Sequence, residues 1–116
     1  MAKILVVEDQ DSMREWLIAV LEGAGHQVSA ARDGLSAISL ATRCAFDLVF
    51  TDISMPEEEG LGMILAVRKV RPELKIIVIS GTDPEVLMDA KILGAYAALR
   101  KPVTSEVVLR CVRELP

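Results

Sequence analysis

The chain has 116 residues, the size of one domain, and a formal net charge of −4. Its hydrophobic fraction of 52% is enough to build a core, and its aromatic fraction of 3% makes that core aliphatic. The negative charge argues against nucleic-acid binding, and no apolar run has the length of a membrane span. The first residues do not resemble a signal peptide, and Cys44 and Cys111 lack metal-site spacing, so we expect a cytoplasmic protein with reduced thiols.

Strand and helix patterns alternate through the first half of the chain. Ser12-Met-Arg-Glu15 has the form of a capping box, and Gly23 with Gly25 marks the end of the helix behind it. The turn signal Asp33-Gly34 separates the second strand from the second helix. The expected elements are strands at Lys3–Val7 and Gln27–Ala31, and helices from about Ser12 to Gly23 and from about Leu35 to Arg43.

The second half continues the alternation. The expected elements are strands at Asp47–Asp52, Lys75–Ser80 and Ala97–Arg100, and helices from Gly60 to about Val70, from near Pro84 to Gly94, and from Thr104 or Ser105 onward. Five strands that alternate with five helices predict an α/β fold with a parallel sheet covered on both faces. Right-handed crossovers make it a doubly wound, flavodoxin-like three-layer sandwich.

Charged and hydroxyl side chains occur where the predicted strands end. Glu8 and Asp9 follow the first strand, and Asp52 ends the third. Ser80 ends the fourth strand, and Lys101 follows the fifth. Each residue has an ordinary alternative as a solvated loop residue, a turn cap or a solvent-facing lysine. However, parallel strands share one carboxyl edge, where such sheets bind ligands, so the joint placement favours a single site.

This set of side chains indicates phosphoryl transfer to a carboxylate. Neighbouring carboxylates repel one another, and a hard cation such as Mg²⁺ relieves the repulsion by binding their oxygens. A lysine supplies positive charge for phosphate oxygens. A carboxylate surrounded by a metal, a lysine and a hydroxyl is suited to attack phosphorus and form an aspartyl phosphate. We therefore expect Glu8 and Asp9 to hold a cation next to Asp52.

The sequence closely resembles the receiver domain of two-component response regulators, including chemotaxis regulators. The resemblance covers essentially all of residues 1–116. The matching stretches have the family's order and spacing: ILVVEDQDSMREWL, DLVFTDISMPEEEGL, IIVISG and GAYAALRKP. The resemblance implies a signalling switch rather than an enzyme, although one that assists its own Mg²⁺-dependent phosphorylation and dephosphorylation.

The resemblance also implies how the acidic residues act. Asp52 would accept a phosphoryl group from the phosphohistidine of a histidine kinase or a histidine phosphotransfer protein. Asp9, Asp52 and the backbone carbonyl of Ser54 would ligate Mg²⁺, and Glu8 would contribute through water.

By the same resemblance, Ser80 would be the switch hydroxyl and Lys101 the phosphate-binding lysine, with a cis bond to Pro102. The chain departs from the family at Ala98, where receivers usually carry Tyr or Phe that rotates with the switch hydroxyl. Tyr96 lies two residues earlier on the same strand face. It either supplies a substitute ring or covers the neighbouring loop.

The fourth predicted helix has more apolar residues than one buried face requires. These residues are Val86, Leu87, Met88, Ala90, Ile92 and Leu93. We expect this helix, the fifth strand and the fifth helix to form the surface that contacts a downstream protein, an output domain or a second copy of the chain. No direct contact with nucleic acid or a membrane is expected.

Two other classes of function use a similar architecture. A flavodoxin-like nucleotide or flavin binder requires a phosphate cradle after the first strand, where this chain has Glu8 and Asp9. A phosphatase of the haloacid dehalogenase type requires a second Asp two residues after the nucleophile, where this chain has Ser54. Within the receiver class, the chain is either a single-domain regulator or a receiver taken from a larger transcription factor or hybrid kinase.

Overall fold

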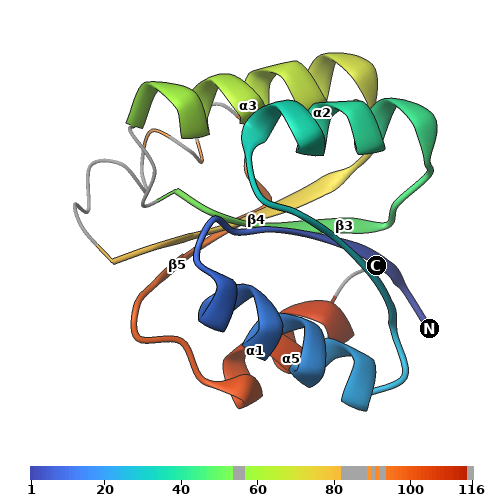
Figure 1. Cartoon of the computed structure of the whole chain (residues 1–116), viewed down its shortest axis with the longest axis vertical. Helices are drawn as coiled ribbons and strands as arrows, with labels where there is room; N and C mark the ends of the chain where they lie inside the picture. The colour runs from blue at the N-terminus through green and yellow to red at the C-terminus, as the bar shows by residue number, and fades with distance from the viewer. Residues whose placement is uncertain (54–56, 82–88, 90, 92–93, 115–116) are drawn as a thin grey trace.

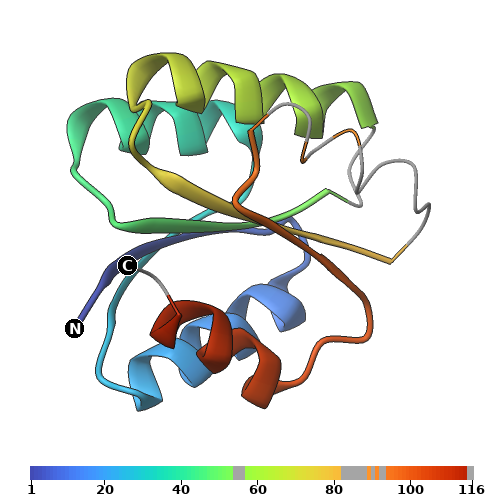
Figure 2. The same cartoon turned by 180° about the vertical axis from the view of Figure 1, so that it is seen from behind.

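The computed structural model describes residues 1–53, 57–81, 89, 91 and 94–114. Its elements are β1 (Lys3–Val7), α1 (Asp11–Gly23), β2 (Gln27–Ala31), α2 (Gly34–Arg43), β3 (Leu48–Asp52), α3 (Glu57–Val70), β4 (Lys75–Ser80), β5 (Ala97–Arg100) and α5 (Ser105–Arg113). The strands form a parallel sheet in the order β2-β1-β3-β4-β5. Helices α2 and α3 cover one face and α1 and α5 the other, which confirms the predicted doubly wound sandwich (Figures 1 and 2).

The alternation of side chains along the strands divides the core into two layers. Leu5 and Val49 are paired in register and pack on the α2/α3 side, whereas their neighbours Val6 and Phe50 are paired and pack on the α1/α5 side. All four side chains are fully buried. A sheet buried on both faces exposes its functional groups at its ends, so the strand order determines where a site lies. That order reverses between β1 and β3, at the centre of the sheet.

The predicted fourth helix, from near Pro84 to Gly94, lies largely outside the described residues. Asp89 and Lys91 are helical, and Gly94 has a φ of 110°, in the left-handed region that favours glycine at a helix end. The part of the chain that the structure describes therefore contains four complete helices, where five were expected. The apolar surface expected on the fourth helix also lies outside the described residues.

The predicted capping box at Ser12 is wrong. Helix α1 begins one residue earlier, at Asp11, and Gln10 occupies the N-cap without a side-chain capping bond among the described residues. The backbone N–H of Gln10 instead donates to Oε2 of Glu8 at 3.0 Å, a local contact that turns the chain just before the helix. The Asp11 carboxylate then lies in the first turn, where negative charge complements the helix dipole.

Two other boundaries differ from the expected ones. Strand β3 begins at Leu48, one residue later than expected, where the Asp47 side chain accepts the backbone N–H of Lys3 at 2.8 Å in place of a backbone carbonyl. Helix α3 begins at Glu57 instead of Gly60. Acidic residues suit the first turn of a helix, so the glutamates that precede Gly60 in the sequence favour this earlier start.

Candidate functional site

Three polar residues of the predicted site are buried at the carboxyl edge of the sheet. Glu8, Asp52 and Ser80 follow or end the three central strands β1, β3 and β4, and each is 1% exposed. Lys101 follows β5 and is partly buried, whereas Asp9 is exposed. Buried acidic residues are rare in proteins unless they are paired or bind a cation, so this edge differs from an ordinary loop region.

The Asp52 carboxylate forms an ion pair with Lys101. The Nζ atom of Lys101 lies 2.5 Å from Oδ2 of Asp52, and the lysine side chain keeps 27% of its surface exposed. The lysine is positioned by its backbone, since its N–H donates to the Ser80 carbonyl at 2.9 Å. The Lys101-Pro102 bond is cis, which confirms that prediction. The ammonium thus reaches the end of β3 from the side of β5, the edge strand beyond β4.

Gly81 makes room for this lysine. A Cβ atom added at Gly81 would lie 3.1 Å from Cδ and 3.4 Å from Cβ of Lys101. The lysine stem therefore passes close over the backbone that follows β4, so that a side chain at this position would require the lysine or the backbone to shift.

Glu8 holds its carboxyl group inside the protein. Oε2 accepts the Gln10 backbone N–H, whereas Oε1 is buried and has no hydrogen-bond partner among the residues described. The pKa of Glu8 is raised to about 8: burial is the largest cause, the neighbouring Asp52 and Asp9 carboxyls also raise it, and the hydrogen bond from the Gln10 backbone lowers it. A buried carboxyl beside other carboxyls is stabilised either by a proton or by a cation.

These residues fit a hard divalent cation. Glu8 has a buried oxygen without a hydrogen-bond partner within the described part of the chain, and Asp52 lies close enough to influence its pKa. Oxygens of this kind are the ligands that Mg²⁺ prefers. Nevertheless, no three His, Cys, Asp or Glu side chains of the described ranges are already grouped as a metal site. Asp9 is exposed, and Ser54 lies outside those ranges.

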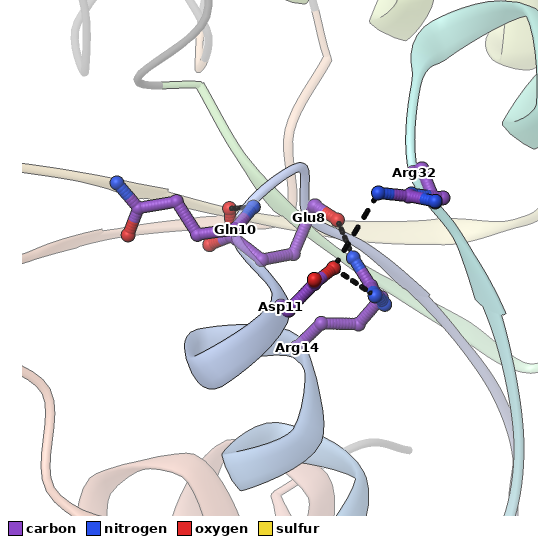
Figure 3. A network of polar contacts seen from close by, with 5 residues as sticks. All are labelled: Glu8, Gln10, Asp11, Arg14 and Arg32. Carbon is purple, nitrogen blue, oxygen red and sulfur yellow. Dashed lines mark hydrogen bonds and ion pairs between the residues drawn. The ribbon is translucent and has the colours of Figure 1, made fainter.

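Arginine residues beside this edge were not predicted as part of it. The guanidinium of Arg14 reaches from α1 to the backbone carbonyl of Glu8 at 3.1 Å and pairs with Asp11 (Figure 3). Asp11 also pairs with Arg32, from the end of β2, at 3.5 Å. The i, i+3 spacing of Asp11 and Arg14 is a usable signal in the sequence, whereas the approach of Arg32 depends on the fold.

A groove of about 450 Å³ adjoins the lysine on the α1 side of the sheet. It is lined by Met13, Trp16, Lys101, Pro102 and Val103. The indole of Trp16 therefore borders the same groove as the residue that pairs with Asp52. Changes at Lys101 are expected to alter the surroundings of this ring.

A buried aspartate at the end of the third strand, with a lysine beside it, on a five-stranded doubly wound sheet, defines the receiver class of signalling domains. The family model for the response regulator receiver domain matches residues 4–113, and the chain belongs to this family.

The relatives of the chain include complete proteins of similar length. The response regulator receiver protein CpdR of Brucella abortus is 36% identical over 107 residues, which are 86% of this chain and 89% of CpdR. The structure of the chemotaxis protein CheY4 of Vibrio cholerae has a TM-score of 0.89 at 32% identity and covers 100% of this chain and 99% of CheY4.

Another similar structure is a response regulator from Burkholderia pseudomallei solved with a phosphorylated aspartic acid, a calcium ion and citrate. Its TM-score is 0.86 at 26% identity, and the match covers 94% of this chain and 65% of that protein. Other relatives are much longer, since the chain spans 21% of a DNA-binding transcriptional regulator and 12% of a sensor kinase. Within the described residues, no helix has the length and apolar character to cross a membrane.

Proposed function

We propose that this chain is a phosphorylation-dependent switch of two-component signalling, with Asp52 as the phosphoacceptor. The observation that carries the proposal is the buried Asp52 carboxylate at the end of β3 with the Lys101 ammonium 2.5 Å away. Burial protects an acyl phosphate from water, and the ammonium offsets the charge that the phosphoryl group brings. The phosphorylated aspartic acid of the Burkholderia protein is consistent with this assignment.

The proposed transfer is a direct displacement at phosphorus. An Asp52 carboxylate oxygen attacks the phosphoryl group of a phosphohistidine, the new P–O bond forms, and the P–N bond breaks with its electron pair returning to the imidazole. The donor is a histidine kinase or a histidine phosphotransfer protein. Lys101 then contacts the phosphoryl oxygens, and Ser80 turns its hydroxyl toward them. Water later hydrolyses the acyl phosphate at the same site.

In this proposal Asp9, Asp52 and the Ser54 carbonyl hold Mg²⁺, with Glu8 contributing through water. The ion, when bound, stabilises negative charge on the transferring phosphoryl group. The protein's own contribution is the arrangement of the acidic groups, since Glu8 is already buried beside Asp52.

We further propose that residues 1–116 form one receiver domain that acts in the cytoplasm. Its output is a changed surface made by the fourth helix, β5 and α5, which binds a downstream protein, an output domain or a second copy of the chain. Relatives of both kinds, whole single-domain regulators and parts of longer proteins, leave both forms of output open for this chain.

Phosphorylation by a small donor tests the proposal. With Mg²⁺ and acetyl phosphate, the mass of the protein should rise by about 80 Da, and base should remove the added group because it is an acyl phosphate. Asp52→Asn removes the nucleophile and should abolish labelling. Asp47→Asn is a matched control at the opposite, exposed end of β3 and should be labelled normally. Labelling of Asp52→Asn would show that another residue is the acceptor.

A further inference from the structure

The Arg14 side chain connects the first helix to the end of the first strand. It is 15% exposed, its Nη1 donates to the Glu8 backbone carbonyl at 3.1 Å, and its Nη2 lies 2.5 Å from Oδ1 of Asp11 (Figure 3). The planar guanidinium therefore spans two acceptors at once, which a lysine ammonium on a flexible stem is poorly shaped to do. A partly buried arginine that donates to one particular carbonyl constrains that carbonyl's direction.

The carbonyl in question belongs to the peptide that joins Glu8 to Asp9. Because a peptide group is planar, fixing its oxygen also fixes the direction in which the chain continues to the Cα atom of Asp9. Glu8 is fixed at two further points, since its N–H donates to Ala31 at 3.0 Å and its Oε2 accepts from Gln10. The hydrogen bond from Arg14 is therefore one of three contacts that orient the acidic turn, and it is the one made to the Glu8 carbonyl.

Arg32 is a natural comparison for Arg14. It approaches the same Asp11 oxygen, but at 3.5 Å, and its side chain is 72% exposed. Arg32 brings the same charge to the same carboxylate, and no hydrogen bond from it to the acidic turn is found among the described residues. A comparison of variants at the two arginines thus separates two effects on the acidic turn: the positive charge nearby, which both supply, and the hydrogen bond to the Glu8 carbonyl, which Arg14 makes.

We infer that Arg14 is a positioning residue that orients the Glu8–Asp9 turn for cation binding. The inference rests on the proposed function, because it concerns the Mg²⁺ that this turn would hold. It also makes a prediction of definite sign. Removing a positive charge beside a cation site favours the cation electrostatically, whereas releasing the peptide weakens binding, so weaker binding in an Arg14 variant identifies positioning as the dominant effect.

The test is a titration of the full chain with Mg²⁺ alone, in which the heat of binding is measured by calorimetry. Arg14→Met and Arg14→Lys should both bind Mg²⁺ about tenfold more weakly than wild type, since neither side chain reproduces the guanidinium fork. Arg32→Gln should stay within about twofold of wild type or bind slightly more tightly. A cooperative thermal unfolding transition shows that a variant is folded. If only one of the two Arg14 variants folds, that variant is enough for the test.

A second readout requires no metal. In the metal-free protein, the amide resonances of Asp9 and Gln10 should shift in the Arg14 variants and stay in place in Arg32→Gln. Unchanged Mg²⁺ affinity in a folded Arg14 variant, or equal weakening in Arg32→Gln, would overturn the inference. Failure of the proposed function is distinguishable, because it would show as absent Mg²⁺ binding and absent Asp52 labelling in the wild-type protein.

Discussion

The Nζ atom of Lys101 lies 2.5 Å from Oδ2 of Asp52. The aspartate side chain is fully buried, and the lysine side chain is partly buried. The lysine compensates the charge of this carboxylate. If Asp52 is the phosphoacceptor, as proposed, a phosphoryl group placed on it would have to take over this contact. The pair would then link the phosphorylation state of Asp52 to the position of the segment that follows β5.

Removal of the lysine charge should destabilise the metal-free protein. Lys101→Met leaves Asp52 buried without its cation, and we expect a loss of roughly 1–3 kcal/mol in the free energy of unfolding, below the value for fully buried pairs because Lys101 is partly exposed. Urea denaturation measures the loss. In an Asp52→Asn background the same substitution should cost much less. Equal losses in the two backgrounds would mean that the ion pair does not contribute.

Cation binding should be detectable without phosphate. Because Trp16 lines the groove that also contains Lys101, its fluorescence should change when Mg²⁺ draws Asp52 away from the lysine. Asp9→Ala should weaken the Mg²⁺ response and leave the fold intact, because Asp9 is exposed. The double variant Asp9→Ala, Asp52→Ala should lose the response. Wild-type affinity in that double variant would rule out these residues as ligands.

The stability of the metal-free protein should fall as the pH rises. Burial, together with the neighbouring Asp52 and Asp9 carboxyls, raises the pKa of Glu8 from 4.5 to about 8 in the folded protein. Below the lower value Glu8 is protonated in both states, so it has no effect. Between the two values the unfolded chain has released a proton that the folded protein keeps, so the stability decreases and is lowest above the folded pKa.

Chemical denaturation in EDTA at about pH 6 and about pH 8.5 checks this slope. The wild-type protein should be less stable at the higher pH, and Glu8→Gln, which has no proton to lose, should show a smaller decrease. Saturating Mg²⁺ should also reduce the decrease in the wild type. The same slope in wild type and Glu8→Gln would exclude Glu8 as its source.

Activation should proceed without a ring movement in β5. The register pairs Ser80 with Arg100, whereas the N–H of Tyr96 donates to Ile76 at the other end of β4. Ile76 and Ser80 are four residues apart along β4, which corresponds to roughly 13 Å. Tyr96 is therefore too far from Ser80 to take the place of the aromatic ring that is missing at position 98. Its ring instead lies 5.2 Å from Nζ of Lys75, measured to the ring centroid.

Spectra with and without beryllofluoride and Mg²⁺ test this switch. We expect the resonances of Ser80, Gly81 and the loop beyond them to change, because a hydrogen bond from Ser80 to a charged oxygen contributes roughly 1.5–3 kcal/mol. The Tyr96 ring resonances should remain in place. A rotamer change at Tyr96 would show that this ring takes part despite its distance.

The sheet was predictable because its strands are short apolar runs with polar boundaries. Strands β1, β2, β4 and β5 have the bounds expected from the sequence. The start of α1 was not predictable, since it depends on a hydrogen bond between the Glu8 side chain and the Gln10 backbone. Local patterns such as Ser12 to Glu15 carry no information about such a contact.

The candidate site was predictable at the level of strand ends and not at the level of side-chain directions. Glu8 and Asp9 are neighbours in sequence, yet Glu8 is buried and Asp9 is exposed. The sequence also gives no sign that Arg14 donates to Glu8, because an arginine on an amphipathic helix is usually a solvent-facing residue. Such details depend on how helix and sheet pack together.

The close passage of Lys101 over Gly81 has a consequence for how this protein tolerates change. A methyl group at Gly81 would press on Cδ of Lys101 at 3.1 Å, so the lysine must shift by a few tenths of an ångström or the backbone must move. Gly81 carries no charge and no hydrogen-bonding side chain, yet a substitution there would displace Lys101 and so change its ion pair with Asp52. A genetic screen for altered signalling should therefore recover Gly81 variants together with variants of the acidic residues.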